Sequence, residues 1–406
     1  MVTPAQHTIE HTLAEKITQG AVKARTPPLL LAILLVGTSD PSLNDFSMIT
    51  GLDSVHLATG IRLAAYTGAM ALILMAGTRT WHSIPRAAWA IVAIAFMSAP
   101  LSIAPMAALA STLKLALTLL AVAAVARFMD LKQVATTVGL SILALVIVSV
   151  PVWQETVYRE PSGIFSTRNE LARAGIMLFL AGLVLVSRRE RKILGAGFAG
   201  VGAYVVVATE SATSILAVAG LCGAFVIAET SRRVRLHQAT RLLIPALILA
   251  GAGVAALWPA VLEMFGRDAT LTGRTEIWSA VLNAIGARPF VGHGYGAYWN
   301  SPLGEGTRWE LGPQVVNAHN GYLEQILDFG VLGGVVVIAI TISIAIGRAR
   351  VEDAGFAALA SMAVLFIYSI TESGLIRPMY FTSIVLLAFA SCGTSATLGD
   401  KESARQ

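Results

Sequence analysis

Charged residues are scarce in this sequence, and their scarcity decides the class of protein. Of 406 residues, 13% are charged and 55% are hydrophobic. A water-soluble domain cannot hide so large an apolar fraction in its core, so lipid must surround much of the chain. The composition therefore predicts an all-α polytopic membrane protein.

The sequence has no cysteine framework, and we also expect no cleavable leader. The two cysteines, Cys222 and Cys392, both fall in apolar runs, where they offer neither disulfide nor zinc-ligand spacing. We expect them to pack against apolar neighbours. The first 26 residues are polar and lack an apolar core followed by a small-residue cleavage site, so we expect no removable signal peptide.

Long apolar runs, by contrast, recur along the whole chain. Each is near the length that crosses about 30 Å of hydrocarbon at about 1.5 Å per residue. They predict about twelve transmembrane helices, near residues 27–39, 58–76, 86–103, 105–127, 133–152, 169–187, 192–208, 212–229, 240–259, 319–346, 353–371 and 377–394.

The basic residues predict the orientation, because Lys and Arg in short connections stay on the cytoplasmic side. Placing both ends inside puts most of the 29 Lys and Arg residues there. We therefore expect cytoplasmic tails at 1–26 and 395–406, and a transmembrane domain at 27–394 that includes a periplasmic loop at 260–318. The net charge of +5 is then mainly a topology signal, and nothing resembles a nucleic-acid-binding module.

The remaining cations break this charge rule and are candidates for ligand binding. A charge at membrane depth costs at least about 2.5 to 3.5 kcal/mol, so it faces a cavity, a partner or a polar ligand. Converging guanidinium groups predict a diphosphate, because Arg binds phosphate through paired donors and stays charged. Three of these cations lie within helices and the others on the outer side: Arg62, Lys114 and Arg173, then Arg159, Arg168, Arg267, Arg274, Arg288, Arg308 and Arg377.

A structural role is the alternative for each of these charges. A single outer arginine can contact a lipid headgroup, and Lys114 can neutralise a buried carboxylate. Glu324, Asp328 and Glu372 lie near the outer ends of their helices and are candidate partners for the arginines.

The GHGYG run at 292–296 imitates a phosphate-binding loop, but no hydrophobic strand precedes it and no Gly-Lys-Ser follows. The fingerprint is weak outside that context. We interpret it as a tight turn after Pro289 that lets the backbone approach a ligand or another helix.

His319 heads a predicted helix, and Asn320 can cap the start of that helix. An imidazole with an ordinary pKa near 6.5, placed at the outer membrane boundary, can accept a proton from a hydroxyl at neutral pH. The alternative is a histidine that only hydrogen-bonds the loop. Tyr322 and Leu323 fall on the same helix face as His319.

These residues carry a family resemblance. A GRTEIW segment from Gly273, a P-x-x-G-x-G turn from Pro289, and His319-Asn320 entering a late helix together resemble the O-antigen ligase and Wzy-type polymerase superfamily. The run from Gly163 to Glu170 is similar to the G-x-F-x-x-[HK]-N motif of its exopolysaccharide polymerases, with Arg168 where His or Lys is commoner. Thr371-Glu372-Ser373 is similar to the C-terminal end of these proteins.

The resemblance implies a GT-C-like architecture and a glycosyltransferase of the bacterial inner (cytoplasmic) membrane, with its active site facing the periplasm. Its donor would be an undecaprenyl-diphosphate-linked oligosaccharide, and a chain-length regulator is an expected partner beside the lipid bilayer. No nucleotide sugar, cofactor or metal is expected, because the diphosphate lipid is the leaving group. Consistent with this, no DxD-like carboxylate pair occurs in an outer loop.

The expected mechanism is a displacement at the anomeric carbon of the donor. His319 would deprotonate the acceptor hydroxyl, with Glu324 as the reserve base, while cations stabilise the departing diphosphate. The diphosphate-binding residues would be Arg168, Arg173, Arg274, Arg62 and Arg377, and the substrate-binding residues Asn169, Asn320, Tyr322, Trp278 and Arg288. Tyr298, Trp299 and Tyr322 could stack on sugars or anchor the protein at the interface.

Three functions remain open at this point. A polymerase would use another lipid-linked repeat unit as acceptor, and the motif at Arg168 and Asn169 favours this. An O-antigen ligase would use lipid A-core oligosaccharide as acceptor, and the loop from Arg274 to His319 fits that equally well. A transporter of a polyanion or lipid-linked glycan would also need buried cations, but no repeat relates the halves of the sequence.

Overall fold

The computed structural model shows the chain as a set of packed helices. It describes residues 26–38, 54–77, 81, 84–152, 162–165, 167–189, 191–231, 274–312, 315–349, 355–370, 372, 373, 375, 377 and 379–392. No β-strand is among the elements of these ranges. For the part of the chain that is described, the all-α prediction is confirmed.

The helices coincide with the predicted apolar segments. Each predicted segment apart from 240–259, which lies outside the described residues, matches one of them. In chain order they are the helix Thr26–Thr38, then α3 (Ser54–Ala76), α5 (Arg86–Ser98), α6 (Pro105–Phe128), α7 (Leu131–Ser149), α8 (Arg168–Ser187), α9 (Lys192–Ala208), α10 (Ala212–Ser231), α14 (Gly321–Ala349), α15 (Gly355–Tyr368) and α16 (Phe381–Ser391).

Five of these helices, α3, α6, α7, α8 and α14, are long and apolar enough to cross a membrane. Shorter apolar helices accompany them. The structure therefore supports a multi-pass membrane protein, whereas the number of twelve crossings and the sidedness stay predictions.

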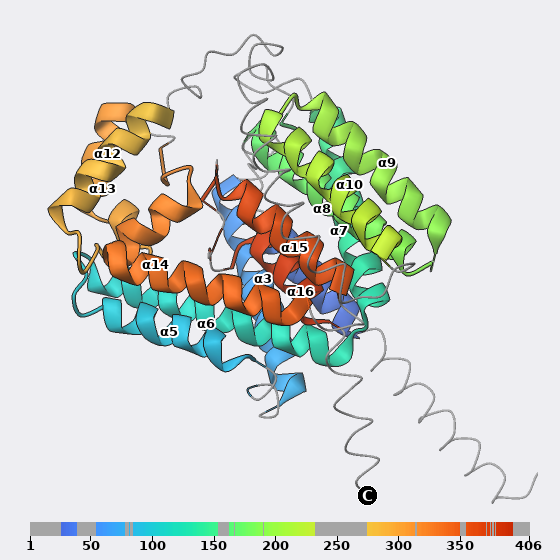
Figure 1. The fold of residues 1–406 in the computed structure, drawn as a ribbon, viewed down its shortest axis with the longest axis horizontal. Coiled ribbons are helices and arrows are strands. Elements are labelled where there is room, and N and C mark those ends of the chain that lie inside the picture. Colours follow the sequence, from blue (N-terminus) through green and yellow to red (C-terminus); the bar gives the residue numbers. More distant parts are fainter. Residues whose placement is uncertain are drawn as a thin grey trace, which may run out of the picture.

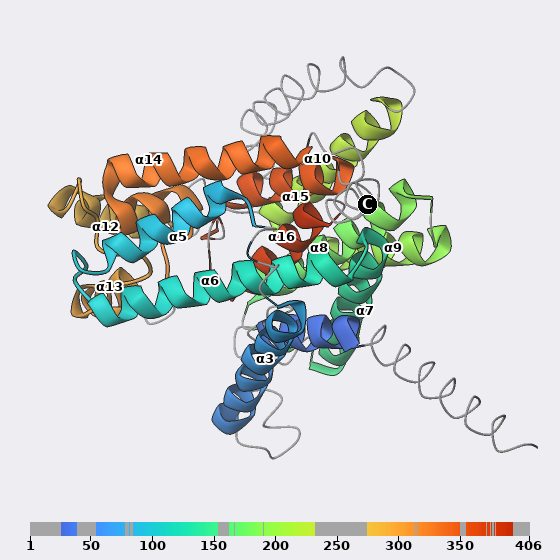
Figure 2. The ribbon, with the colours of Figure 1, turned by 90° about the horizontal axis from the view of Figure 1, so that it is seen from below.

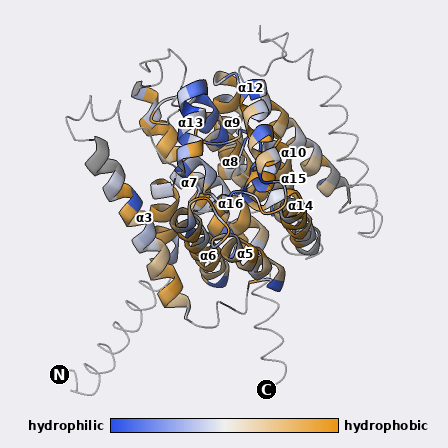
Figure 3. Cartoon of the chain, turned by 90° about the vertical axis from the view of Figure 1, so that its left-hand side faces the viewer, coloured by the Kyte–Doolittle hydropathy of each residue, from blue (hydrophilic) through white to orange (hydrophobic). Residues whose placement is uncertain are grey.

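Two more polar helices occupy the predicted outer loop 260–318. They are α12 (Arg274–Ala287) and α13 (Pro302–Leu311), with the short 3-10 turn η2 (Tyr298–Asn300) between them. Figure 3 shows hydrophilic residues gathered on α12 and α13, while α5, α6 and α14 are mainly hydrophobic. Residues 260–273 of this loop lie outside the described part.

The helices form two groups joined in the middle (Figure 1). On one side α5 packs between α6 and α14, and on the other α8 packs against α7 and α9. α15 and α16 connect the groups, since they contact α14 and α8. Figure 2 shows α12 and α13 at one end of the pair formed by α6 and α14.

α14 is not the single continuous helix that the sequence predicted. Gly330 has φ 73° and ψ 174°, which breaks the helix in its first third. The loop after α12 binds at the break: the His293 amide donates to the Leu327 carbonyl (2.9 Å), the Gly294 amide to that of Asp328 (2.9 Å), and the Val331 amide to that of Pro289 (2.7 Å). The predicted tight turn thus brings its backbone against a helix.

Glycines allow α8 and α9 to pack with their backbones in contact. A Cβ added at Gly202 would lie 2.6 Å from both the Gly175 carbonyl oxygen and the Phe179 amide nitrogen. One added at Gly200, on the same helix, would meet nothing within 4 Å. Small residues at such crossings let membrane helices approach closely.

We expect Gly202→Ala to lower the free energy of unfolding by about 1 to 3 kcal/mol, because backbone atoms cannot move aside. The matched control is Gly200→Ala, which should be neutral or stabilising by at most about 1 kcal/mol, since alanine is the better helix former. Thermal unfolding of both variants in detergent measures the difference. Equal melting temperatures would contradict the proposed close packing.

Candidate functional site

Three basic side chains from distant parts of the sequence meet at Glu372, which lies between α15 and α16. Nη2 of Arg173 on α8 is 3.3 Å from Oε2 of Glu372. Nη2 of Arg274, the first residue of α12, is 3.0 Å from Oε1. Nδ1 of His319, in the loop before α14, is 3.6 Å from Oε2. We call these four residues the Glu372 cluster.

The carboxylate of the Glu372 cluster is ionised despite its burial. Only 9% of the Glu372 side chain is exposed, and burial alone would raise its pKa. The His319 imidazole and the guanidinium groups of Arg173 and Arg274 outweigh that effect and lower the pKa of Glu372 to about 2. One negative charge therefore lies between two guanidinium groups at neutral pH, which leaves a net charge of +1 on these three side chains.

Arg173 is fixed in place by aromatic rings as well as by its carboxylate. Its guanidinium carbon lies 5.2 Å from the ring centre of Tyr368 and 5.0 Å from that of Tyr380. Arg377 lies 4.5 Å from the ring centre of the same Tyr380. These distances suit cation-π contacts, so Tyr380 contacts both arginines.

The loop that carries His319 is held on two sides. On one side, the indole N–H of Trp278 on α12 donates to the Ala318 carbonyl (3.0 Å). On the other, the side-chain oxygen of Asn320 accepts from the Tyr322 and Leu323 amides, both at 3.0 Å. Asn320 thus caps α14 as expected. His319 itself has a φ of 45°, and 28% of its side chain is exposed.

Asn320 also joins the start of α14 to the segment that carries Glu372. Its side-chain amide donates to the Ile370 carbonyl (3.0 Å), and its backbone amide donates to Oγ of Ser373 (3.3 Å). The Tyr322 hydroxyl donates to the Phe366 carbonyl (3.0 Å). Asn320, Tyr322 and Trp278, predicted to bind substrate, thus form bonds that hold His319 beside Glu372.

A cation-lined cavity of about 310 Å³ opens next to the cluster. Arg62 of α3, Lys114 of α6 and Arg377 line it, and so do the carboxylates of Glu324 and Asp328. Two residues that line the cavity adjoin the cluster. Ser373 follows Glu372 in the chain, and Tyr380 contacts the guanidinium group of Arg173. Arg62 and Lys114 are exposed at its edge.

Glu324 is engaged in three hydrogen bonds. Its Oε1 accepts from the Trp299 indole (2.8 Å), and its Oε2 accepts from the Ala318 amide (2.8 Å) and from the Ser373 hydroxyl (3.2 Å). These bonds tie the His319 loop, η2 and the segment after Glu372 together. A structural role for Glu324 is therefore evident beside the predicted role of reserve base.

The motif at the start of α8 makes structural contacts, while its predicted contact with substrate stays a prediction. The side-chain oxygen of Asn169 accepts from the Ser211 hydroxyl (3.1 Å), and its carbonyl accepts from the Tyr368 hydroxyl (3.3 Å). Asn169 therefore positions Tyr368, on which Arg173 rests. Arg168 is half-buried at the first position of α8.

Arg288 lies apart from the cluster, in the turn that follows α12. One of its guanidinium nitrogens, Nη1, is buried without a hydrogen-bond partner. His293 in the same turn is buried, with its Nδ1 3.3 Å from the Leu327 carbonyl oxygen. Burial is the largest cause that lowers the pKa of His293, so this imidazole is neutral and structural.

Sequence reasoning missed the hub of the site. It named Glu372 as one of three candidate partners for the arginines and as part of a motif of the family resemblance, and it assigned no role to Tyr368 or Tyr380. The sequence did contain a signal for Glu372, namely a carboxylate between two apolar segments, because a charge in such a place needs a partner of opposite charge. Which cations would reach it depends on contacts between residues far apart in the sequence, 98 positions for Arg274 and 199 for Arg173.

Replacing Glu372 by glutamine should destabilise the protein by about 3 to 5 kcal/mol, because two buried guanidinium groups lose their counter-charge. The pKa of Glu372 is lowered from 4.5 to about 2, so its stabilising charge is fully present above pH 4.5 and is lost as the pH falls towards 2. The difference in unfolding free energy between the wild type and Glu372→Gln should shrink over that range. Chemical denaturation in detergent at several pH values measures it.

The matched control for this prediction is Glu276→Gln, which removes an exposed carboxylate from α12. Its unfolding free energy should stay close to that of the wild type at every pH. A pH-independent difference between Glu372→Gln and the wild type would show that Glu372 is not the ionised centre of the cluster.

Comparison with known proteins finds a similarity to one family. The model of the family described as O-antigen ligase matches residues 197–338, which include Arg274 and His319. The exopolysaccharide production protein ExoQ of Rhizobium meliloti (strain 1021) is 28% identical over 244 residues, covering 55% of this chain and 56% of that protein. The chain thus spans little more than half the length of this relative. The resemblance predicted from the motifs is confirmed, because both comparisons find this chain similar to the O-antigen ligase and Wzy-type polymerase superfamily.

Proposed function

We propose that this chain is a glycosyltransferase of the bacterial inner membrane with its active site facing the periplasm. It transfers a glycan from undecaprenyl diphosphate to a sugar hydroxyl and so polymerises exopolysaccharide or O-antigen repeat units. The single observation that carries the proposal is the Glu372 cluster beside the cation-lined cavity. Six basic side chains gather there: Arg173, Arg274, His319, Arg62, Lys114 and Arg377.

The cations supply the electrostatic part of the reaction. As the sugar leaves, negative charge grows on the departing diphosphate, and cations fixed in advance stabilise it without reorganising. Arg62, Lys114 and Arg377 surround space large enough for such a group. Arg274 gives one N–H donor to Glu372 and keeps others for a phosphate oxygen, because a guanidinium has five. No metal ion is required in this scheme.

His319 supplies the proton transfer. With Nδ1 towards the ionised Glu372, its Nε2 is left to accept the proton of the acceptor hydroxyl as that oxygen attacks the anomeric carbon. A neighbouring carboxylate orients the imidazole and stabilises the imidazolium that forms, as in other base and carboxylate pairs. The partial exposure of His319 gives an acceptor access to it.

Polymerisation is favoured over ligation by one comparison and one motif. The similar protein ExoQ is described as an exopolysaccharide production protein, and the segment from Gly163 to Asn169 is similar to the motif of exopolysaccharide polymerases. The matching family model carries the name of the ligase reaction, so transfer to lipid A-core is the second candidate.

An assay with a defined lipid-linked oligosaccharide separates the two candidates. The purified protein is incubated with that donor alone, or with the donor and lipid A-core, in buffer with and without EDTA. A ladder of longer lipid-linked glycans from the donor alone supports polymerisation. A product that forms only with lipid A-core would show ligation instead of polymerisation. Loss of transfer on adding EDTA would contradict the metal-free scheme.

Arg274→Lys should lower glycan transfer about a hundredfold or more, because an ammonium cannot bind a carboxylate and a phosphate with forked geometry. The matched control is Arg189→Lys, since Arg189 lies past the C-terminal end of α8 and forms an exposed ion pair with Glu229. Initial rates with the lipid-linked donor measure both variants. Wild-type turnover of Arg274→Lys would remove Arg274 from the site.

His319→Ala should lower the rate of transfer about a hundredfold to ten-thousandfold, the usual share of a general base, and leave donor binding intact. Measuring the Kd for the lipid-linked donor alongside the transfer rate separates these effects. An active His319→Ala variant would place the base elsewhere, and a variant that no longer binds donor would make His319 part of the diphosphate site.

A further inference from the structure

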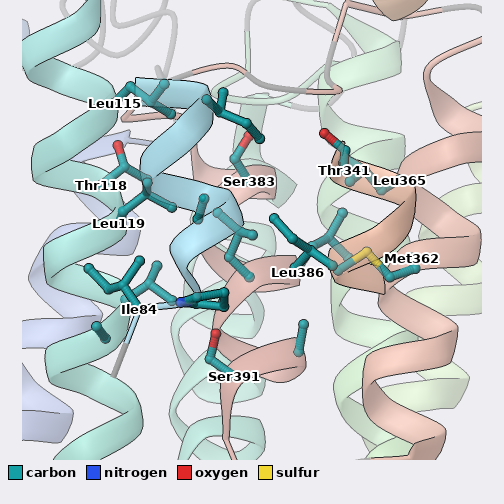
Figure 4. A pocket seen from close by; sticks show the side chains of 18 of the residues that line it. Ile84, Leu115, Thr118, Leu119, Thr341, Met362, Leu365, Ser383, Leu386 and Ser391 are labelled. Atoms are coloured by element: carbon teal, nitrogen blue, oxygen red, sulfur yellow. The ribbon is translucent and has the colours of Figure 1, made fainter. Parts of the chain in front are cut away.

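A second cavity, of about 110 Å³, lies among α5, α6, α14, α15 and α16. Its walls are mainly apolar, and the polar residues among them are Thr118, Thr341, Arg377, Ser383 and Ser391. In Figure 4 the side chains of Leu115 and Leu119 on α6 stand opposite Leu365 and Met362 on α15, with Leu386 of α16 between them. We call this space the apolar cavity.

The apolar cavity adjoins the cation-lined cavity at Arg377. Leu375 and Arg377 line both spaces. Their segment is fastened to α6, because the Met379 amide donates to the Thr118 hydroxyl (2.8 Å) and Thr118 also lines the apolar cavity. A molecule with a charged end at Arg377 could therefore continue directly into apolar surroundings.

The apolar cavity runs along the helices rather than across them. On α6 its lining extends from Leu115 to Ala126, which is about 16 Å at 1.5 Å per residue. On α16 it extends from Ser383 to Ser391, about 12 Å on the same scale. Figure 4 shows this elongated shape, with Leu115 at one end and Ser391 at the other.

We propose that the apolar cavity holds the part of the isoprenoid chain nearest to the diphosphate in the lipid carrier, with Arg377 at the junction between chain and phosphate. This proposal rests on the proposed function and adds the place where the lipid part of the donor binds. Charge complementarity supports it, since Arg377, which also lines the cation-lined cavity, is the one charged residue among the described residues that line the apolar cavity.

The physical role of this site is orientation. A carrier that arrives from the bilayer leaves surroundings as apolar as the cavity, so the hydrophobic effect adds little affinity. Held along α6 and α16, however, the chain fixes the direction from which the diphosphate enters the cation-lined cavity. Correct placement of the reacting atoms is worth more for the rate than extra binding.

The first test fills the cavity from α6. Ala123 is buried and lines the apolar cavity, so Ala123→Phe should lower kcat with the undecaprenyl-linked donor about tenfold, because overpacking displaces the chain that orients the diphosphate. The same variant should leave transfer unchanged from a donor whose lipid is replaced by a methyl group. Ala110→Phe, at an exposed position of the same helix, is the matched control and should act as the wild type with both donors.

The second test measures binding in the absence of catalysis, and it remains valid if Ala123→Phe does not fold. A photoreactive benzophenone amino acid replaces Met362, which lines the cavity, or Leu113, which is exposed on α6. The probe is labelled undecaprenyl diphosphate without sugar. We expect cross-linking from position 362 that excess unlabelled undecaprenyl diphosphate suppresses and phosphatidylglycerol does not.

Different outcomes separate this proposal from the proposed function. Equal suppression by phosphatidylglycerol at position 362 would make the cavity a general site for lipid chains and overturn the proposal. Normal glycan transfer without cross-linking at 362 would overturn it while the function stands. Cross-linking at 362 in a protein that transfers no glycan would support the site and refute the glycosyltransferase function.

Discussion

The charge on Glu372 is the constraint on which the rest of the site depends. Arg173, Arg274 and His319 come from three separate segments, and each approaches the others only because a carboxylate stands between them. Without it, two guanidinium groups would repel each other in surroundings of low dielectric. The electrostatic attraction thus joins α8 to α12 and the His319 loop, and it sets the position of each basic group before a substrate arrives.

Around this centre the structure divides the basic groups into two kinds. Arg173 is buried among aromatic rings and paired, which makes it a fixed source of positive potential. Arg62 and Lys114 lie exposed at the edge of a cavity, where an anionic ligand can reach them. Arg377 has features of both kinds, because it contacts the Tyr380 ring that Arg173 also contacts and it lines the cation-lined cavity. Fixed positive groups such as Arg173, close to cations that a ligand can reach, form an arrangement that can stabilise a departing anion.

Much of the helical framework could be predicted because length and apolarity suffice to locate a membrane helix, as for α6 and α8. The cap at Asn320 could be predicted because capping is local. The pairing of Arg173 with Glu372 could not, since the two residues are 199 positions apart and several carboxylates competed for the same arginine. The helix break was equally hidden, because Gly330 looks no different in sequence from Gly333 and Gly334, which remain helical.

The break at Gly330 divides α14 into a short part and a long part that can move separately. The short half from Gly321 to Phe329 carries the capped end next to His319, while the half beyond Gly330 provides a wall of the apolar cavity through Thr341 and Ile344. The carbonyls that end the short half bond to the His293 and Gly294 amides instead of to the rest of α14. A tilt of the long half in the bilayer therefore need not shift the imidazole, whose position follows α12 and its turn.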